Sequence, residues 1–370
     1  MYILGIETSC DETSASIVAD GQIILSNEVA TSLAEHSQFG GVVPEIASRR
    51  HLEWMIETIT SALTKANLTL GQVSAVAVTQ GPGLPGALIV GISMAKALAL
   101  ALEKPILGIH HLQAHLYANF LSQSNQQSPA IEFPYMGLIV SGGHTILVLV
   151  HDVDQYKVIG QTLDDAVGEA FDKVAKLLGL GYPGGPVIDA KAKKGNLSAI
   201  AFPRAMIHEK NFDFSFSGIK TAVLRIVANY MTHPQDGRCE VASEKQSAKT
   251  GVKKEGLSIQ AVNDICASFQ EAVVDVLVRK SLQACQEFKT KHLIVGGGVS
   301  ANSRLRERLT EEGKQEKIQV FFPPKGLSID NAAMVAGLAG ALWKKGYSSN
   351  LSLMAQPNWN IETAIQATTS

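Results

Sequence analysis

The sequence is poor in cysteine, and its few cysteines form no recognisable pattern. Only four of the 370 residues are cysteine (Cys10, Cys239, Cys266 and Cys285), and no two of them form a CxxC pair. This excludes a disulfide framework and a zinc site built from CxxC pairs as the basis of the fold. The usage is typical of a reducing compartment, and we therefore expect a cytoplasmic protein.

The chain also lacks an excess of charge of either sign. It has 32 Lys and Arg against 34 Asp and Glu, with a formal net charge of −2 and a sequence pI near 6.6. Such a balance gives no general attraction to nucleic acid. An RNA partner would need a local basic patch, or a second protein that supplies the positive field.

Signals for export or a membrane are missing as well. The first residues, Met1 to Ile6, contain no basic segment and no cleavage site, and their alternation predicts a strand. The segment 84–102 is long and apolar, but it carries Lys96 together with several Gly and Ser residues. It is more typical of a buried core helix than of a membrane span, and we expect no membrane association.

Several catalytic motifs are absent. The glycine-rich loop 81–86 lacks the Lys-Ser/Thr that ends a Walker A loop, and the chain has no Gly-x-Ser-x-Gly elbow. No Glu stands next to His111, which argues against an HExxH metalloprotease. The Gly296–Asn302 segment is not GxGxxG, so a Rossmann dinucleotide site is not indicated.

What the chain does contain is a possible metal site made of distant residues. His111 and His115 are four positions apart, and on a helix both imidazoles would point the same way. Asp330, in the segment Ser328–Ala333, is a candidate for the carboxylate on the facing side. Two imidazoles and one carboxylate suit Fe²⁺, with Zn²⁺ as second choice. A pair of structural histidines is the alternative.

The sequence also indicates an internal repeat. The segment Gly5–Thr13 aligns with Gly137–Thr145 so that Gly, Ser and Thr coincide, and apolar strands follow each segment. We interpret this as two duplicated halves around a cleft, at 1–133 and 134–346, followed by a tail at 347–370. The polar, lysine-rich stretch 234–256 is predicted to be a mobile insertion in the second half.

Small-residue turns in both halves could hold a nucleotide. The turns Ser9–Thr13 and Ser141–Thr145 could wrap a phosphate with backbone N–H groups. The Gly296–Gly298 turn could let a ribose or a base approach closely. Asp172 and Asp189 could accept hydrogen bonds from sugar hydroxyls, or could belong to a solvated helix face. Asn302 could contact a ligand, or could simply cap a helix.

Periodicity predicts an alternating α/β chain. Helices are expected at 45–66, 86–102, 166–179, 185–194, 217–232, 258–288 and 331–345, with a helix that carries the histidine pair after 109 and another that starts at 302. Strands are expected at 2–8, 14–19, 22–29, 73–79, 105–109, 292–295 and 318–322.

Taken in order, these motifs identify a family. The segments Gly5–Thr13, Gly40–His51, Gly81–Gly86, His111/His115, Ser141–Thr145, Phe214–Thr221, Gly296–Asn302 and Asp330-Asn331 resemble, over nearly the whole chain, the bacterial tRNA threonylcarbamoyladenosine transferase family, TsaD. The resemblance implies an actin-like ATPase (ASKHA) α/β fold with two ribonuclease-H-like halves around a nucleotide cleft. It implies transfer of a threonylcarbamoyl group from L-threonylcarbamoyl-AMP to N6 of adenosine 37, in tRNAs that read codons beginning with A, with release of AMP.

The resemblance also assigns residues and partners. It places one Fe²⁺ on His111, His115 and Asp330, and substrate contacts at Ile139, Val140, Ser141, Gly142, Gly143, Asp172, Gly185, Asp189 and Asn302. Glu12 or His144 could position the nucleophile or carry a proton. The implied partners are tRNA, the shortened relative TsaB, the ATPase TsaE and, as source of the adenylate, TsaC. A nucleotide-dependent kinase or ATPase of the same fold is the alternative.

Overall fold

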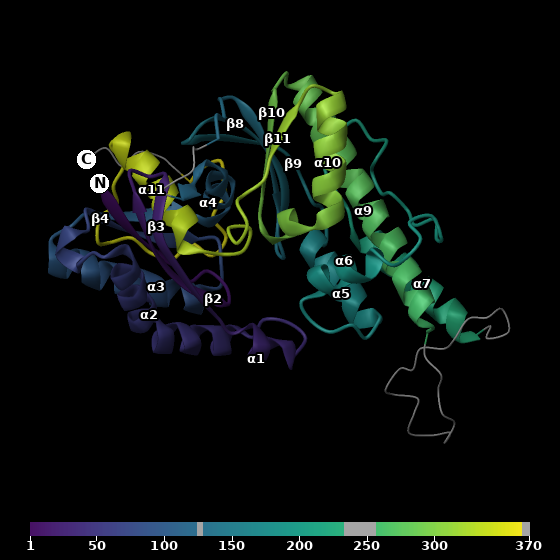
Figure 1. The fold of residues 1–370 in the computed structure, drawn as a ribbon, viewed down its shortest axis with the longest axis horizontal. Coiled ribbons are helices and arrows are strands. Elements are labelled where there is room, and N and C mark those ends of the chain that lie inside the picture. Colours follow the sequence, from purple (N-terminus) through teal and green to yellow (C-terminus); the bar gives the residue numbers. More distant parts are fainter. Residues whose placement is uncertain (124–128, 233–256, 365–370) are drawn as a thin grey trace.

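The computed structural model describes residues 1–123, 129–232 and 257–364, and these residues form an elongated α/β molecule with one sheet in each half (Figure 1). The segment 234–256, predicted as a mobile insertion, lies outside the described residues. The first half of the chain supplies the first sheet, and residues from 135 onward supply the second.

Five strands follow the same order in the two sheets, and the first sheet has β6 in addition. The first contains β1 (Tyr2–Glu7), β2 (Glu12–Ala19), β3 (Ile23–Thr31), β4 (Ala75–Gly81), β5 (Ile106–His110) and β6 (Ser122–Gln123), in the order β5-β4-β1-β2-β3-β6. The second contains β7 (Tyr135–Val140), β8 (Thr145–Asp152), β9 (Gln155–Gln161), β10 (His292–Gly296) and β11 (Gln319–Phe321), in the order β11-β10-β7-β8-β9. In both, three antiparallel strands are extended by two parallel ones on the side of the first strand.

The helices agree closely with the predicted ranges, although the short α1 and the 3-10 turns were not predicted. They are α1 (Leu33–Ser37), α2 (Pro44–Ala66), α3 (Pro85–Leu102), α4 (His111–Tyr117), α5 (Val167–Leu177), α6 (Gly184–Ala192), α7 (Ser217–Thr232), α9 (Ile259–Glu287), α10 (Ser303–Gln315) and α11 (Ala332–Lys344), with 3-10 turns η1 (Leu70–Gln72), η2 (Ala118–Phe120) and η4 (Gly298–Ala301).

Helices cover both faces of the first sheet. Alternate residues of β1 face opposite sides, so Leu4 and Ile6 pack with α2 and α3, whereas Ile3 packs with α4 and α11. Gly5 faces α11 at close range, because a Cβ there would lie 2.4 Å from the Ala332 carbonyl oxygen. The late helix α11 therefore belongs spatially to the first sheet, as the yellow helix beside the purple strands in Figure 1 shows.

The second sheet separates two cores in the same way. Leu138, Val140 and Leu147 face the helices α5, α7 and α9 in the larger core. Ile139 and Ile146 face the opposite side, where they pack with Leu112 and Leu116 of α4, among others. Helix α4 thus contacts both sheets and connects the two halves.

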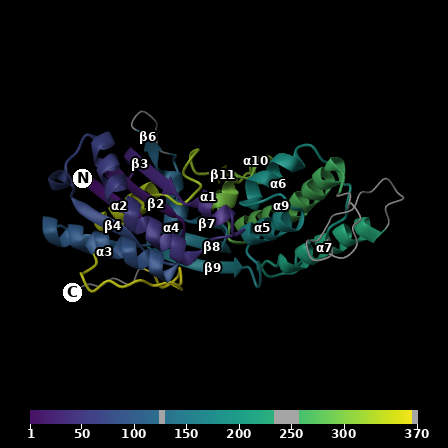
Figure 2. The same ribbon diagram turned by 90° about the horizontal axis from the view of Figure 1, so that it is seen from below.

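The segment after α11 runs back along the molecule (Figure 2). Gln356 N donates to the Gln80 carbonyl at the end of β4 (2.8 Å), and Val158 N of β9 donates to Glu362 Oε1 (2.7 Å). As far as it is described, the predicted tail is therefore bound to both sheets.

By length and composition, one described helix could cross a membrane, namely α3, and a third of its residues are buried. Its buried face, which includes Leu88, Ile92 and Ala95, packs on the first sheet in the core that also contains α2 residues. This packing agrees with the predicted core helix. Its other face is exposed.

Candidate metal centre

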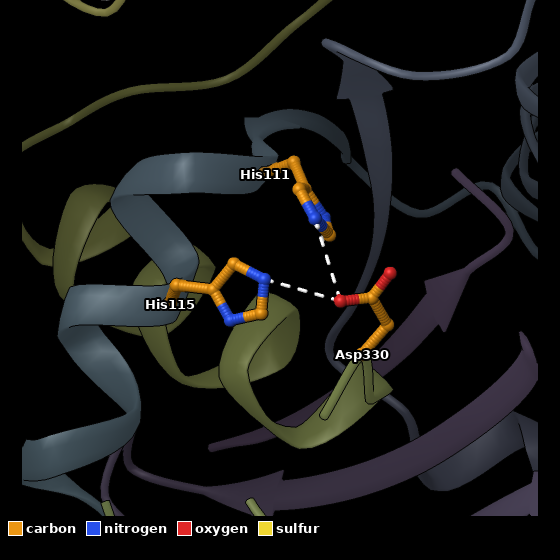
Figure 3. Close-up of side chains that lie close together, drawn as sticks. All are labelled: His111, His115 and Asp330. Atoms are coloured by element: carbon orange, nitrogen blue, oxygen red, sulfur yellow. Dashed lines mark ion pairs between the residues drawn. The ribbon is translucent and has the colours of Figure 1, made fainter. Parts of the chain in front are cut away.

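The three predicted metal ligands lie together. His115 Nε2 is 3.1 Å from Asp330 Oδ1, and His111 Nε2 is 3.5 Å from the same oxygen. One potential ligand atom from each residue falls within 4.8 Å of the others. Figure 3 shows both imidazoles pointing from α4 toward the carboxylate, which lies just before α11.

Local structure fixes these positions. Helix α4 begins directly after β5, and His110 caps its first turn by accepting from Gln113 N. His111 and His115 therefore lie on successive turns of one helix face. Asn331 caps α11, with its side chain accepting from Met334 N, and this cap places Asp330 at the entrance to the helix.

A carboxylate behind the histidines orients one of them. His111 Nδ1 lies 3.1 Å from Glu7 Oε2, which also accepts a hydrogen bond from Thr79 Oγ1 (2.6 Å). Glu7 is fully buried, and its other oxygen accepts from Ser9 N. With Nδ1 protonated toward Glu7, Nε2 of His111 has a free lone pair, as in the carboxylate–histidine pairs of metal sites. Glu7 was not among the predicted site residues, although an acidic residue at the end of an apolar strand is a usable signal.

The electrostatics agree with a cation site. Burial alone would lower the pKa of His111, but Asp330 and Glu7 outweigh it and raise that pKa to about 9. Burial would raise the pKa of Asp330, but His111 and His115 hold it well below its usual range. The buried carboxylate of Glu7 and the partly buried carboxylate of Asp330 thus favour positive charge on the groups between them.

The nitrogen and oxygen atoms of this group suit a metal ion. Although close to Asp330, the buried Nε2 of His115 has no hydrogen-bond partner among the described residues. A buried polar atom without a partner is costly in a folded protein, and a nitrogen that ligates an ion would have that partner. Two imidazole nitrogens and a carboxylate oxygen therefore fit a divalent transition metal.

Glu12 and His144 lie near this group. Burial and then the charges of Asp330 and Asp11 raise the pKa of Glu12 well above its usual range. Burial, followed by the charges of His111 and His115, lowers the pKa of His144 to about 4. At neutral pH His144 is therefore a neutral imidazole.

The turn that contains His144 is open on its glycine side. A Cβ at Gly142 or Gly143 would meet no atom within 4 Å, whereas a Cβ at Gly297 would lie 2.5 Å from the Val140 carbonyl oxygen. Ser141 accepts a hydrogen bond from Gly168 N at the start of α5 (3.1 Å). The Ser141–Gly143 and Gly296–Gly298 turns thus meet at the carboxyl ends of β7 and β10, where α/β sheets commonly bind ligands.

The other predicted substrate residues have structural partners. The side chains of Ile139 and Val140 are fully buried, so only their backbone is available to a ligand. Asp172 Oδ1 accepts from Gly184 N (2.7 Å), and Asp189 Oδ1 accepts from Ser303 Oγ (2.7 Å). These bonds join α5 to α6 and α6 to α10.

Asn302 is the N-cap of α10. Its Oδ1 accepts from Leu305 N (3.0 Å), and its Nδ2 donates to Gln270 Oε1 (2.8 Å). The capping alternative is therefore confirmed for this residue. Gly185, in contrast, has open space where a side chain would begin.

Solved structures with little sequence similarity share this fold. Component A of (R)-2-hydroxyglutaryl-CoA dehydratase from Acidaminococcus fermentans matches with a TM-score of 0.51 and 14% identity, over 93% of this chain and 98% of that one. Full-length HypF in its phosphate- and nucleotide-bound form matches with a TM-score of 0.56 and 13% identity, over 93% of this chain and 46% of that one. At this identity the likeness concerns the fold alone, a mixed α/β architecture with two sheets.

Sequence comparison identifies the family. Residues 23–337 match the model of the TsaD family, described as tRNA N6-adenosine threonylcarbamoyltransferase. Proteins of that name from Syntrophotalea carbinolica and Trichlorobacter lovleyi are 46% and 45% identical to this chain, over 98% of it and over 98% and 97% of their own lengths. A Clostridium botulinum relative is 47% identical over 96% of both chains. The chain therefore belongs to the tRNA N6-adenosine threonylcarbamoyltransferase family.

Proposed function

We propose that this protein transfers the threonylcarbamoyl group of L-threonylcarbamoyl-AMP to N6 of adenosine 37, in tRNAs that read codons beginning with A. Family membership supports the reaction class. The observation that carries the proposal is the His111–His115–Asp330 group, with both histidines buried and Asp330 partly buried, near the glycine turn that precedes His144. An adenylate has an electrophilic carbonyl, which the metal-ligand group suits, and an anionic phosphate, which the glycine turn suits.

We further infer an actin-like ATPase (ASKHA) fold that arose by internal duplication. The equal strand orders of the two sheets support this inference, as does the alignment of Gly5–Thr13 with Gly137–Thr145. In both sheets a small-residue turn follows the first strand and leads into an antiparallel second strand.

Fe²⁺ is the cofactor we propose, with Zn²⁺ as second choice. His111 and His115 would supply neutral nitrogens and Asp330 an anionic oxygen, with Glu7 holding the His111 ring in place. When bound there, the ion would act as a Lewis acid that polarises the carbamoyl carbonyl.

The protein's own groups orient the reactants. The backbone N–H groups of Gly142 and Gly143, which adjoin open space, offer donors for the phosphate. In the transfer step the N6 lone pair attacks the carbamoyl carbon. The N6–C bond forms, the bond from that carbon to the phosphate oxygen breaks, and AMP leaves. N6 loses a proton, which the neutral imidazole of His144, or Glu12 when it is ionised, would accept.

Partner proteins are part of the proposal. Two neighbouring helices of the first half expose large apolar side chains, Leu52 and Ile56 on α2 and Ile89 and Leu100 on α3. Exposed apolar residues gathered on packed helices are typical of a protein interface. We propose that TsaB binds this chain in the cytoplasm, together with TsaE, and that TsaC supplies the adenylate.

Transfer of labelled threonine to unmodified tRNA tests the function. The chain, its helper proteins and the adenylate should yield labelled tRNA and one AMP for each label. Release of AMP without label in the tRNA would contradict the proposal. Phosphoryl transfer from ATP to a sugar would favour a kinase of the same fold.

A further inference from the structure

A cavity lies on the face of the second sheet that packs against α4. It is a cavity of about 440 Å³, lined by His144, Ile146 and Gln161 of the second sheet, by Leu112 of α4 and by the segment Pro357–Glu362, among others. This volume falls within the range of roughly 300–1,000 Å³ that is usual for small-molecule sites. Of the residues that line it, only His144 has a role in the function proposed above.

The wall formed by Pro357–Glu362 is a firmly held strap. Gln113 Nε2 donates to the Ile361 carbonyl (3.0 Å), and His110 Nε2 lies 3.2 Å from the Trp359 carbonyl. The Trp359 ring also packs on the His110 ring, at 5.1 Å between centroids. Ile361 is buried in the core that includes Leu112 and Leu116. The strap is therefore fixed to the first turn of the helix that carries His111 and His115.

The cavity and most predicted adenylate contacts lie on opposite faces of the second sheet. Along β8, Ile146 faces α4, whereas Thr145 faces α5, where its Oγ1 accepts from Val167 N (2.8 Å). Asp172 and Gly185, on α5 and α6, belong to that second layer. The Ser141–His144 turn lies between these two sides of the sheet. Gly142 and Gly143 adjoin open space, and His144 lines the cavity. The adenylate, bound on one side of this turn, and the base that receives its acyl group, bound on the other side, would thus meet beside His111 and His115.

The lining of the cavity suits a purine base. Asn358 and Gln161 line the cavity with exposed side-chain amides that form no hydrogen bond with the described residues, and Trp359 adds an aromatic ring. Asn and Gln amides read adenine because they donate to one of its ring nitrogens and accept from its exocyclic amino group. Unpaired RNA bases are bound by such amides together with stacking on aromatic side chains.

We propose that this cavity is the acceptor subsite, which takes the target adenine of an RNA loop once that base has been turned out of its stack. Asn358 and Gln161 read the base, Trp359 contacts its ring, and the N6 amino group points toward His144. The assignment rests on the proposed function, because it presumes an adenine acceptor.

Cross-linking locates the acceptor directly. An anticodon stem-loop carrying a photoreactive adenine at the target position is irradiated with the full chain and its helpers, and the modified peptide is identified by mass spectrometry. Attachment within 357–362 or at His144 and Gln161 is the expected result. Attachment confined to the helices α5, α6 or α10 would overturn the assignment.

Kinetics of cavity variants provide the second test. Asn358→Leu and Trp359→Ala should raise KM for the stem-loop about tenfold or more, the loss expected for one base contact. Binding of a non-hydrolysable adenylate analogue and the metal content should stay at wild-type values. Asn358→Asp, which keeps the oxygen that accepts a hydrogen bond, should raise KM for the stem-loop less than Asn358→Leu does. Met354→Ala is the control, because Met354 is exposed and precedes the strap without lining the cavity.

The two proposals fail in different ways. If the wild-type chain with its helpers transfers no label to tRNA, the proposed function is wrong. If it transfers label and the Asn358 and Trp359 variants keep the wild-type KM, the function stands and the acceptor subsite is wrong.

Discussion

The two sheets present different chemistry at equivalent edges. At the carboxyl ends of β1, β4 and β5, the first sheet carries Glu7, Thr79 and His110, and α4 adds His111 directly after β5. At the carboxyl ends of β7 and β10, the second sheet carries glycine turns whose Gly142 and Gly298 adjoin open space. The edge of the first sheet presents polar and charged side chains, whereas the edge of the second sheet presents accessible backbone.

This difference shows how one topology serves two tasks. Holding a cation needs side chains with fixed rotamers, so the first edge is buried and its groups hold one another in place. Receiving a flat or phosphorylated ligand needs access to backbone N–H groups, which a Cβ would obstruct. A substitution at one edge should therefore leave the properties of the other edge unchanged.

Removal of a ligand should have the largest effect. Asp330→Ala or His115→Ala should leave the chain folded but without bound metal, and transfer should fall by about 10²–10³-fold or more, the loss expected for a group that stabilises developing charge. Metal analysis of the purified protein and the labelled-threonine assay measure both results. His151→Ala, at an exposed histidine of β8, is the control. Full metal content in either ligand variant would remove the metal centre from the proposal.

Metal uptake should depend on pH, while the glycine edge should not. Asp330 and Glu7 raise the pKa of His111 to about 9, so in the metal-free protein its ring is protonated at pH 7 and must lose that proton to bind an ion. Affinity should therefore rise about tenfold per pH unit up to about pH 9 and level off above it. Competition with a chelator across this range measures the slope. A flat profile would mean that His111 is not a ligand.

Glu7→Gln separates orientation from ligation. The glutamine keeps the shape of the side chain but removes its charge, so it holds the His111 ring less firmly and should lower metal affinity by about 10–100-fold. It should also lower the pKa of His111 and weaken the pH dependence. Glu57→Gln, on the exposed face of α2, is a matched control. An unchanged metal affinity would show that Glu7 has only a structural role.

The smallest effects should come from the glycine edge. Gly142→Ala adds a methyl group in open space, so it should leave Tm unchanged and weaken adenylate binding a few-fold. Gly297→Ala has a φ of +90° and too little room beside the Val140 carbonyl, and it should destabilise the fold by more than ~1 kcal/mol. Calorimetry and analogue binding distinguish the two variants. A lower Tm for Gly142→Ala would mean that this turn is packed rather than open.

Local patterns in the sequence were sufficient for much of the fold. The helices at 45–66, 86–102 and 217–232 were predicted to within one residue, because each has strong periodicity or a Pro and Gly boundary. The His111–His115–Asp330 group was also predicted. Residues four apart on a helix share one face whatever the helix packs against, so the histidine pair could be recognised from its spacing. Whether the predicted domain boundaries are correct stays open to test, although α11 packs on the first sheet.

The parts that were missed depend on contacts between distant segments. Glu7 reaches His111 across more than a hundred residues, and nothing near either residue records that contact. The strap at 357–362 was predicted as a tail, because its polar, Asn-rich sequence forms no regular element. Its backbone carbonyls accept the bonds from His110 and Gln113, and carbonyls are the same in every sequence.

The placement of Asp330 on a late helix affects how the protein matures. A ribosome delivers the histidine pair long before it delivers α11, the helix that completes the ion-binding group on the first sheet. A nascent chain that has emerged only through the second sheet lacks Asp330, and so it has only two of the three candidate ligands. Assembly of the three-residue group is consequently a late event of biosynthesis, after most of the chain has been made.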